Sequence, residues 1–238
     1  MLIAQNPPNF APMNSCKLQD LGLMDYQTAW ALQKELFNSA IHDKLNHLKP
    51  AFAHHLLVCE HPHVYTLGKS ADTKNLLLSQ NQLTEKNISV YNIERGGDIT
   101  YHGPGQLVVY PIFDLETLKI GVKEFVYKVE ECIISTLKTF GIESQRIAGR
   151  IGIWLGKDTN NERKIAAIGI KCSRYITMHG LALNVTTDLN YFNFIIPCGI
   201  LDKAVTSIQS EIHRSEILID VKNELIKQFS TIFELKFN

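Results

Sequence analysis

The sequence lacks the features that mark several classes of protein. Its 238 residues carry 24 Lys+Arg and 24 Asp+Glu, so no excess of basic charge favours nucleic acid or an anionic membrane surface. No apolar run approaches the ~18 residues that a transmembrane helix needs. Residues 1–16 include three prolines and no basic residue, unlike a signal or transit peptide. We therefore expect a cytoplasmic protein that binds neither nucleic acid nor membrane.

Cysteine is scarce, and the histidine pairs have no obvious partners. An odd number of widely spaced cysteines without a C-x-x-C pair suits reduced thiols better than a disulfide framework. His54/His55 and His61/His63 have no Cys or acidic partner at ligand spacing, so we expect hydrogen-bonded histidines and no metal site. The five cysteines are Cys16, Cys59, Cys132, Cys172 and Cys198.

The apolar pattern predicts a single α+β domain. Hydrophobic residues make up 45% of the chain and charged residues 20%, which is typical of a globular protein. Residues 1–16 are expected to form a flexible lead-in, and 17–238 one domain. Many short strands among about three helices predict a mixed, mostly antiparallel sheet with helices packed on it. The expected helices span 25–40, with Asp25 as the N-cap, 122–140, which Gly141 ends, and 215–231. The expected strands span 54–60, 107–113, 151–155, 164–170 and 181–185. Residues 69–87 are polar and are expected to form loops, and Pro111 is expected to mark the end of its strand.

One stretch, Arg95–Gln106 (RGGDITYHGPGQ), stands out. It has four glycines, a proline, and an Arg, Asp, Tyr and His within twelve residues, between apolar runs at 88–93 and 107–113. Glycine lets the backbone approach a ligand closely and present bare N–H groups to it. The alternative is a hairpin whose glycines only turn the chain. Because polar residues are interleaved with the glycines, we expect a loop that faces a ligand.

Cys198 is a candidate nucleophile, and its reactivity would depend on a partner. It lies between a proline and a glycine after an apolar run, so its thiol would be exposed on a rigid turn; the alternative is a structural cysteine. Its possible partners are His102, His179 and Lys164. Lys164 opens a strand of small apolar residues, where burial favours a neutral amine and a nearby thiolate favours a charged one. A solvent-exposed Lys164 and a structural His179 are the alternatives.

Taken together, these segments resemble the octanoyltransferases of lipoate biosynthesis. Several linked motifs in the same order carry the resemblance, and the most specific is RGGDITYHGPGQ followed by LVVYP. The others are Asp25-Tyr26 with Ala29-Trp30, Glu60–Pro62, Tyr65–Gly68, Lys164–Gly169 (KIAAIG), His179–Asn184 (HGLALN), Pro197–Gly199 and, more weakly, Thr206-Ser207.

The resemblance implies a fold, a reaction and a set of residues. It implies the fold of biotin and lipoate protein ligases and transfer of an octanoyl group from octanoyl-acyl carrier protein to a lysine of lipoyl domains, which occur in 2-oxoacid dehydrogenases and the glycine cleavage H protein. It implies that Cys198 forms the acyl-thioester intermediate, that Lys164 moves protons, that no cofactor is needed, and that the protein acts as a monomer. The substrate-binding positions that it implies are Arg95, Gly96, Gly97, Asp98, Ile99, Thr100, Tyr101, His102, Ala167, Ile168, Gly169, Gly180, Leu181 and Ala182. Small residues at Ala167, Gly169 and Gly180 are expected to leave room for the acyl chain.

Three other functions compete with this interpretation. An ATP-dependent lipoate ligase would carry a different glycine-rich segment and would not need Cys198. A non-catalytic protein that binds acyl carriers or lipoyl domains would not need Lys164 and Cys198 together. A Cys–His hydrolase using His102 or His179 would lose the acyl group to water. The transferase accounts for the most motifs.

Overall fold

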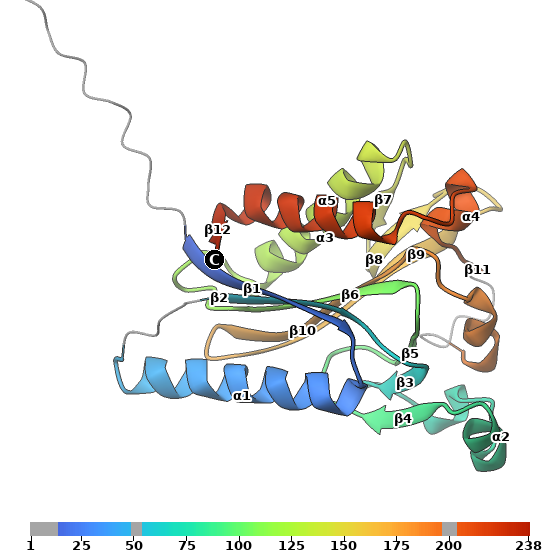
Figure 1. Cartoon of the computed structure of the whole chain (residues 1–238), viewed down its shortest axis with the longest axis horizontal. Helices are drawn as coiled ribbons and strands as arrows, with labels where there is room; N and C mark the ends of the chain where they lie inside the picture. Colours follow the sequence, from blue (N-terminus) through green and yellow to red (C-terminus); the bar gives the residue numbers. More distant parts are fainter. Residues whose placement is uncertain (1–13, 49–53, 197–203) are drawn as a thin grey trace, which may run out of the picture.

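The computed structural model describes residues 14–48, 54–196 and 204–238, in which most strands join one mixed sheet. The strand order is β12-β1-β2-β6-β10-β9-β8-β7, and β11 pairs with β9 (Figure 1). Neighbours are antiparallel from β2 to β7, whereas β1 is parallel to β2 and β12, and β11 to β9. The strands span Asn14–Leu23 (β1), His54–Glu60 (β2), Gln106–Phe113 (β6), Gln145–Ile147 (β7), Arg150–Leu155 (β8), Arg163–Ser173 (β9), Ile176–Asn184 (β10), Ala204–Val205 (β11) and Leu235–Phe237 (β12). The expected mixed, mostly antiparallel sheet is confirmed.

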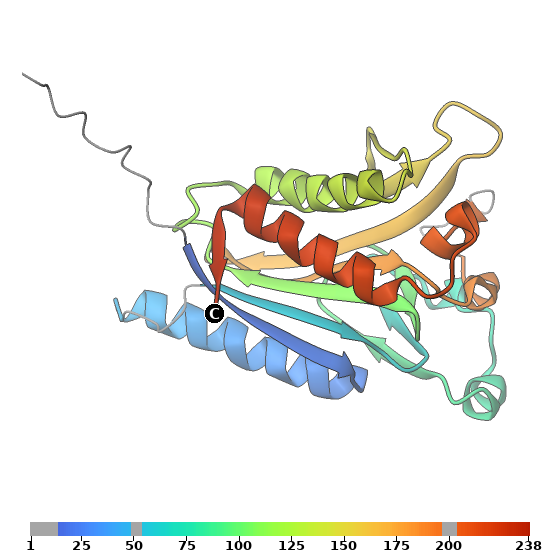
Figure 2. The same ribbon diagram turned by 45° about the horizontal axis from the view of Figure 1, so that its top comes forward.

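Long helices cover both faces of this sheet (Figures 1 and 2). On one face lie α3 (Val122–Thr139) and α5 (Leu218–Phe233), and on the other lies α1 (Tyr26–Leu45). Successive strand residues point to opposite faces, so Leu56 joins the core under α3 and α5 while Leu57 joins the core under α1. Within the described ranges, no helix is long and apolar enough to cross a membrane.

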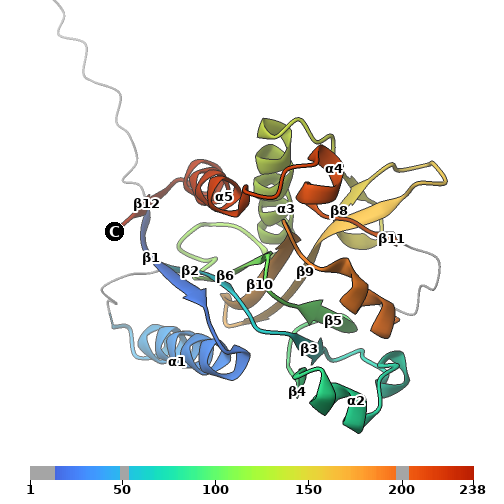
Figure 3. The ribbon, with the colours of Figure 1, turned by 45° about the vertical axis from the view of Figure 1, so that its right-hand side comes forward.

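A second, smaller sheet lies beside the main sheet (Figure 3). Its order is β4-β3-β5, and Tyr65, Leu83 and Tyr101 lie in its core. Strand β5 ends four residues before β6 begins, so the small sheet holds the glycine-rich segment next to the main sheet. The remaining elements are β3 (Val64–Leu67), η1 (Thr73–Asn75), α2 (Gln80–Glu85), β4 (Ser89–Asn92), β5 (Ile99–His102), η2 (Leu189–Phe194) and α4 (Ile208–Ile212).

The three predicted helices are present, and their ends follow ordinary capping chemistry. The side chain of Asp25 caps α1, as expected, but the helix continues to Leu45, five residues past the expected end. Residues 69–87, expected to be rich in loops, also contain the short helix α2. Ser79 and Gln82 form a capping box that starts this helix, a signal that is visible in the sequence.

Two strands differ from expectation. Pro111 does not end β6, which continues to Phe113 between β2 and β10. The register of β6 with β10 runs only from Gln106 to Val109. Beyond it the Thr177 hydroxyl donates to the Pro111 carbonyl (2.8 Å) and accepts from the Phe113 N–H (2.9 Å), so these backbone groups stay bonded. Strand β1 begins at Asn14, inside the predicted lead-in, and Cys16 is fully buried in the core.

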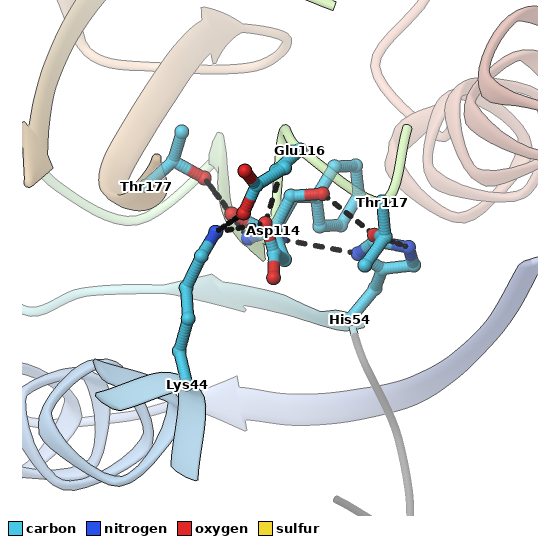
Figure 4. Close-up of polar contacts among 7 residues, drawn as sticks. Lys44, His54, Asp114, Glu116, Thr117 and Thr177 are labelled. Atoms are coloured by element: carbon cyan, nitrogen blue, oxygen red, sulfur yellow. Dashed lines mark hydrogen bonds and ion pairs between the residues drawn. The ribbon is translucent and has the colours of Figure 1, made fainter. Parts of the chain in front are cut away.

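A polar cluster links the end of α1 to the turn after β6 (Figure 4). Lys44 Nζ lies 2.9 Å from Asp114 Oδ1 and 2.7 Å from Glu116 Oε2. The backbone N–H of Asp114 donates to Nδ1 of the fully buried His54 (3.3 Å), and His54 Nε2 lies 3.3 Å from the Thr117 hydroxyl. An N–H can only donate, so His54 Nδ1 is an acceptor and the ring is neutral.

This cluster predicts a loss of stability in acid. Burial lowers the pKa of His54 to about 4, below the ordinary value of 6.5. Between these values the unfolded chain binds the proton that the folded protein rejects, so stability falls as the pH drops from 6.5 to 4, by about 2 kcal/mol at pH 5. Urea unfolding at pH 7 and pH 5 measures the effect. His54→Gln should lose about this much less stability between the two pH values than wild type, whereas the exposed control His47→Gln should behave like wild type; equal losses in all three proteins would contradict the prediction.

Candidate active site

A cavity of about 410 Å³ lies where the glycine-rich segment faces the main sheet. Its walls come from residues 95–100 and 102, from β6, β8, β9, β10 and β11, and from the start of α1. Small residues pair across two of these strands where they line the cavity: Ala167 of β9 pairs with Ala182 of β10, and Gly169 with Gly180. Apolar walls with a few polar groups are typical of a site for a small ligand.

The structure brings almost all of the predicted site residues to this cavity. Lys164 lines it together with the predicted substrate-binding residues of the loop, β9 and β10, except Tyr101. Tyr101 is fully buried in the small sheet, where its ring stacks on Tyr191 and its hydroxyl lies 2.8 Å from His63 Nδ1. The physical reason is the alternation of β5, which points Tyr101 into the small core and its neighbour His102 to the other side.

Arg95 and Gly96 attach the loop to both sheets. The Arg95 guanidinium donates to the carbonyl (2.8 Å) and hydroxyl (3.1 Å) of Thr66 in β3, and the N–H of Gly96 donates to the Ile170 carbonyl in β9 (3.1 Å). The glycine-rich segment is therefore more than a turn between strands. It is a rigid wall that closes the cavity over β9.

Glycine is needed at positions 169 and 180 for a different reason from the one that we predicted. A Cβ on Gly169 would lie 2.9 Å from Arg95 Cδ, and one on Gly180 would lie 2.0 Å from the Val109 carbonyl oxygen. Both positions thus make room for protein atoms, so the expectation that they leave room for the acyl chain is not supported. Ala167 and Ala182 remain the small side chains of the cavity floor.

Lys164 lies where three strands meet. It pairs with Trp154 of β8 on one side and with Val205 of β11 on the other. Its Nζ lies 4.9 Å from the centroid of the Trp154 ring, a cation–π distance. The alternative of a lysine in bulk solvent at a hairpin end does not describe Lys164, which lines the cavity.

Cys198 lies outside the described residues, so its predicted role stays a prediction. The described chain on either side of it does reach the site. Phe192 before it and Ala204 after it both line the cavity, and Val205 pairs with Lys164. The other described cysteines are free thiols, and burial raises the pKa of each of them.

The histidines of the site are neutral and weakly basic. Burial lowers the pKa of His102 to about 3, and burial with Arg95 and Lys171 nearby lowers that of His179 to about 3. A group with so low a pKa is a poor general base at neutral pH, which argues against His102 and His179 in that role. His61 is hydrogen bonded, with Nδ1 2.7 Å from the Met24 carbonyl and Nε2 2.7 Å from the Tyr110 hydroxyl.

Sequence reasoning missed several residues of the cavity wall. Tyr26 is buried, lines the cavity and stacks with His102. Gln106 and Asn184 belong to the motifs that carry the resemblance, yet no role was predicted for them. Their signal was a polar side chain at the end of an apolar strand, which needs hydrogen-bond partners when buried. The other residues missed include Trp154 and Tyr110.

Comparisons with known proteins agree with this geometry. Residues 25–230 match the family described as "lipoyl protein ligase A/B catalytic domain". The chain is 50% identical over 228 residues to an octanoyltransferase of Cytophaga hutchinsonii, and the match covers 93% of each chain. It is 48% identical over 206 residues to an octanoyltransferase of Bacteroides fragilis (87% of this chain, 92% of the relative) and over 223 residues to one of Flavobacterium johnsoniae (92% and 96%).

Solved structures share the fold at low identity. A bi-partite lipoate protein ligase from Thermoplasma acidophilum superposes with a TM-score of 0.70 and 15% identity, over 94% of this chain and 86% of the other. A lipoate protein ligase of the same organism with bound lipoic acid gives 0.68 and 16%, over 94% and 88%. These confirm the predicted single-domain α+β fold. The chain therefore belongs to the lipoyl protein ligase A/B catalytic domain family, as an acyltransferase that moves octanoyl groups in protein lipoylation.

Proposed function

We propose that the octanoyl donor is octanoyl-acyl carrier protein, that Cys198 carries the group as a thioester, and that the acceptor is a lysine of a lipoyl domain. Such domains occur in 2-oxoacid dehydrogenases and the glycine cleavage H protein. The observation that supports this most is that Lys164 lines the cavity together with residues from both described segments that flank Cys198 in the sequence, and pairs with Val205 of the second of them. Residues 17–238 would act as one catalytic domain, in a monomeric, cytoplasmic protein.

The first step of the proposed reaction loads the enzyme. The Cys198 thiolate attacks the thioester carbonyl, a new sulfur–carbon bond forms, and the carbon–sulfur bond of the donor breaks. Lys164 takes the proton of the Cys198 thiol and gives it to the departing thiolate of the carrier. Donor and intermediate are both thioesters of similar free energy, so the step needs no ATP.

The second step delivers the group. The neutral amine of the acceptor lysine attacks the acyl-enzyme carbonyl, the nitrogen–carbon bond forms and the bond to Cys198 Sγ breaks. Lys164 accepts the proton that the amine loses and returns it to the Cys198 thiolate. The amide product is more stable than the thioester, which drives the reaction forward.

The experiment that tests this function is an ATP-free transfer assay. We would mix the purified protein with octanoyl-loaded acyl carrier protein and an unmodified lipoyl domain, without nucleotide. The mass of the lipoyl domain is then measured by intact mass spectrometry. We expect the gain of one octanoyl group on wild-type domain and none on a domain whose acceptor lysine is replaced by arginine. Modification that occurs only with free octanoate and ATP would identify an adenylating ligase and overturn the proposal.

A further inference from the structure

A buried chain of hydrogen bonds crosses the floor of the cavity from His102 to the strand that carries Lys164. His102 Nδ1 lies 2.8 Å from Gln106 Oε1, and Gln106 Nε2 donates to Asn184 Oδ1 (2.9 Å). Asn184 Nδ2 donates to the Thr206 carbonyl (3.0 Å), and the Thr206 N–H donates to the Lys164 carbonyl (2.9 Å). Gln106 and Asn184 are 1% and 4% exposed, so no solvent competes for these bonds.

Backbone carbonyls fix the donor and the acceptor of each hydrogen bond in this series. The Thr206 carbonyl can only accept, so the amide nitrogen of Asn184 must face it and its oxygen must face Gln106. Gln106 then donates to that oxygen and also to the Tyr101 carbonyl (3.1 Å), which again only accepts. With both amide protons of Gln106 engaged, its oxygen faces His102 as an acceptor. His102 Nδ1 therefore carries the proton.

This assignment leaves His102 Nε2 with a free lone pair. The ring lines the cavity and stacks on Tyr26, with centroids 6.0 Å apart. Among the described residues, none forms a hydrogen bond with Nε2; Nδ1 holds the bond of this ring. A neutral imidazole in this form accepts a hydrogen bond at Nε2, and its low pKa keeps it from taking the proton itself.

We propose that Gln106 and Asn184 are positioning residues that hold His102 in the neutral Nδ1–H form, so that Nε2 accepts a hydrogen bond from an N–H group of the substrate. The inference rests on the proposed function, because the octanoyl group itself has no N–H. That function offers two sources of the same chemistry, the amides of the arm on which the carrier protein holds its thioester and the amine of the acceptor lysine.

The tautomer is tested directly on the wild-type protein. With ¹⁵N-labelled histidine, long-range proton–nitrogen spectra should show His102 with a protonated Nδ1 and an unprotonated Nε2 from pH 5 to pH 8. A signal for protonated Nε2 would overturn the proposal. This readout does not depend on activity, so it stays informative if wild type forms no acyl-enzyme and the proposed function itself fails.

A variant of Gln106 tests whether its hydrogen bond sets the protonation of His102. In Gln106→Glu a carboxylate would accept from Nδ1 and raise the pKa of His102, so the ring should titrate closer to neutral pH. The exposed control Gln80→Glu should leave the His102 signals unchanged. Thermal melting checks that the Gln106→Glu protein is folded. If His102 then titrates as in wild type, the hydrogen bond from Gln106 does not set the protonation of His102.

Two variants of His102 separate the Nδ1 bond to Gln106 from the hydrogen-bond acceptor at Nε2. The amide of His102→Asn can replace the Nδ1 bond to Gln106 but leaves no group near Nε2, whereas the longer His102→Gln places its amide there. We expect the asparagine variant to be about tenfold slower than wild type and the glutamine variant to recover part of this loss. Loading and delivery are timed separately: slow loading assigns the N–H to the carrier arm, and slow delivery assigns it to the acceptor lysine. Wild-type rates in both steps would overturn the proposal.

Discussion

Replacing Cys198 by serine is expected to lower the rate of octanoyl transfer by about 10³-fold or more. A serine hydroxyl at neutral pH is a far weaker nucleophile than a cysteine thiol, and Lys164 alone cannot activate it to the same degree. The oxygen ester that a serine could form would also be attacked more slowly by the acceptor amine. Intact mass after mixing with octanoyl-loaded acyl carrier protein is the measurement.

The mass experiment has a control within the chain. Wild type should gain one octanoyl group that hydroxylamine removes, and the Cys198→Ser protein should form no thioester. Cys172→Ser removes the half-buried thiol of β9, whose pKa burial raises, and should load like wild type. Loss of the adduct with Cys172→Ser instead would move the nucleophile to that residue. Transfer without any adduct would point to direct attack by the amine on the donor.

Replacing Lys164 by methionine is expected to slow transfer by about 10²- to 10⁴-fold, the usual contribution of a general acid–base group. The two roles of the lysine can be separated, because arginine keeps the positive charge but does not release its proton. Lys164→Arg should therefore still stabilise the Cys198 thiolate and yet fail in transfer. Lys164→Met should fail in both.

Alkylation by iodoacetamide across the pH range measures how far Lys164 stabilises the Cys198 thiolate, and transfer kinetics measure its role in proton transfer. Wild type and Lys164→Arg should react with iodoacetamide near neutral pH, while Lys164→Met should need a more alkaline pH because no cation favours the thiolate. The exposed Lys157, in the turn before β9, supplies the control Lys157→Met, which should match wild type throughout. Unchanged transfer in Lys164→Met would leave the proton transfer to another group.

Much of the fold was predictable because its signals are local. The apolar stripe of α3 and the stop at Gly141 fix that helix from sequence alone, and Asp25 caps α1 as expected. The missed features depend on contacts far apart in the sequence. Pro111 lies in a central strand at a point beyond the β6–β10 register, where the Thr177 hydroxyl bonds its carbonyl, and β12 pairs with β1 from the other end of the described chain.

The site shows the same division. Lys164 and the glycine-rich segment were found from residue type and order, and both line the cavity. The roles of Gly169 and Gly180 could not be found in that way, since the atoms that need the space belong to Arg95 and to β6. Gln106 and Asn184 were likewise invisible as a pair, because 78 residues separate them and only the register of β6 with β10 joins them.

The pairing of the two ends of the described chain also has a consequence for handling the protein. Strand β12 lies along β1, with Asn14 opposite Leu235 and Cys16 opposite Phe237, and the N–H of Asn238 donates to the Cys16 carbonyl (3.1 Å). Without these residues, the outer edge of β1 would present unpaired backbone groups next to the apolar core that Leu235 now fills. Such an edge recruits strands from neighbouring molecules. The short last strand therefore covers the backbone groups at the start of β1 and closes the core beside them.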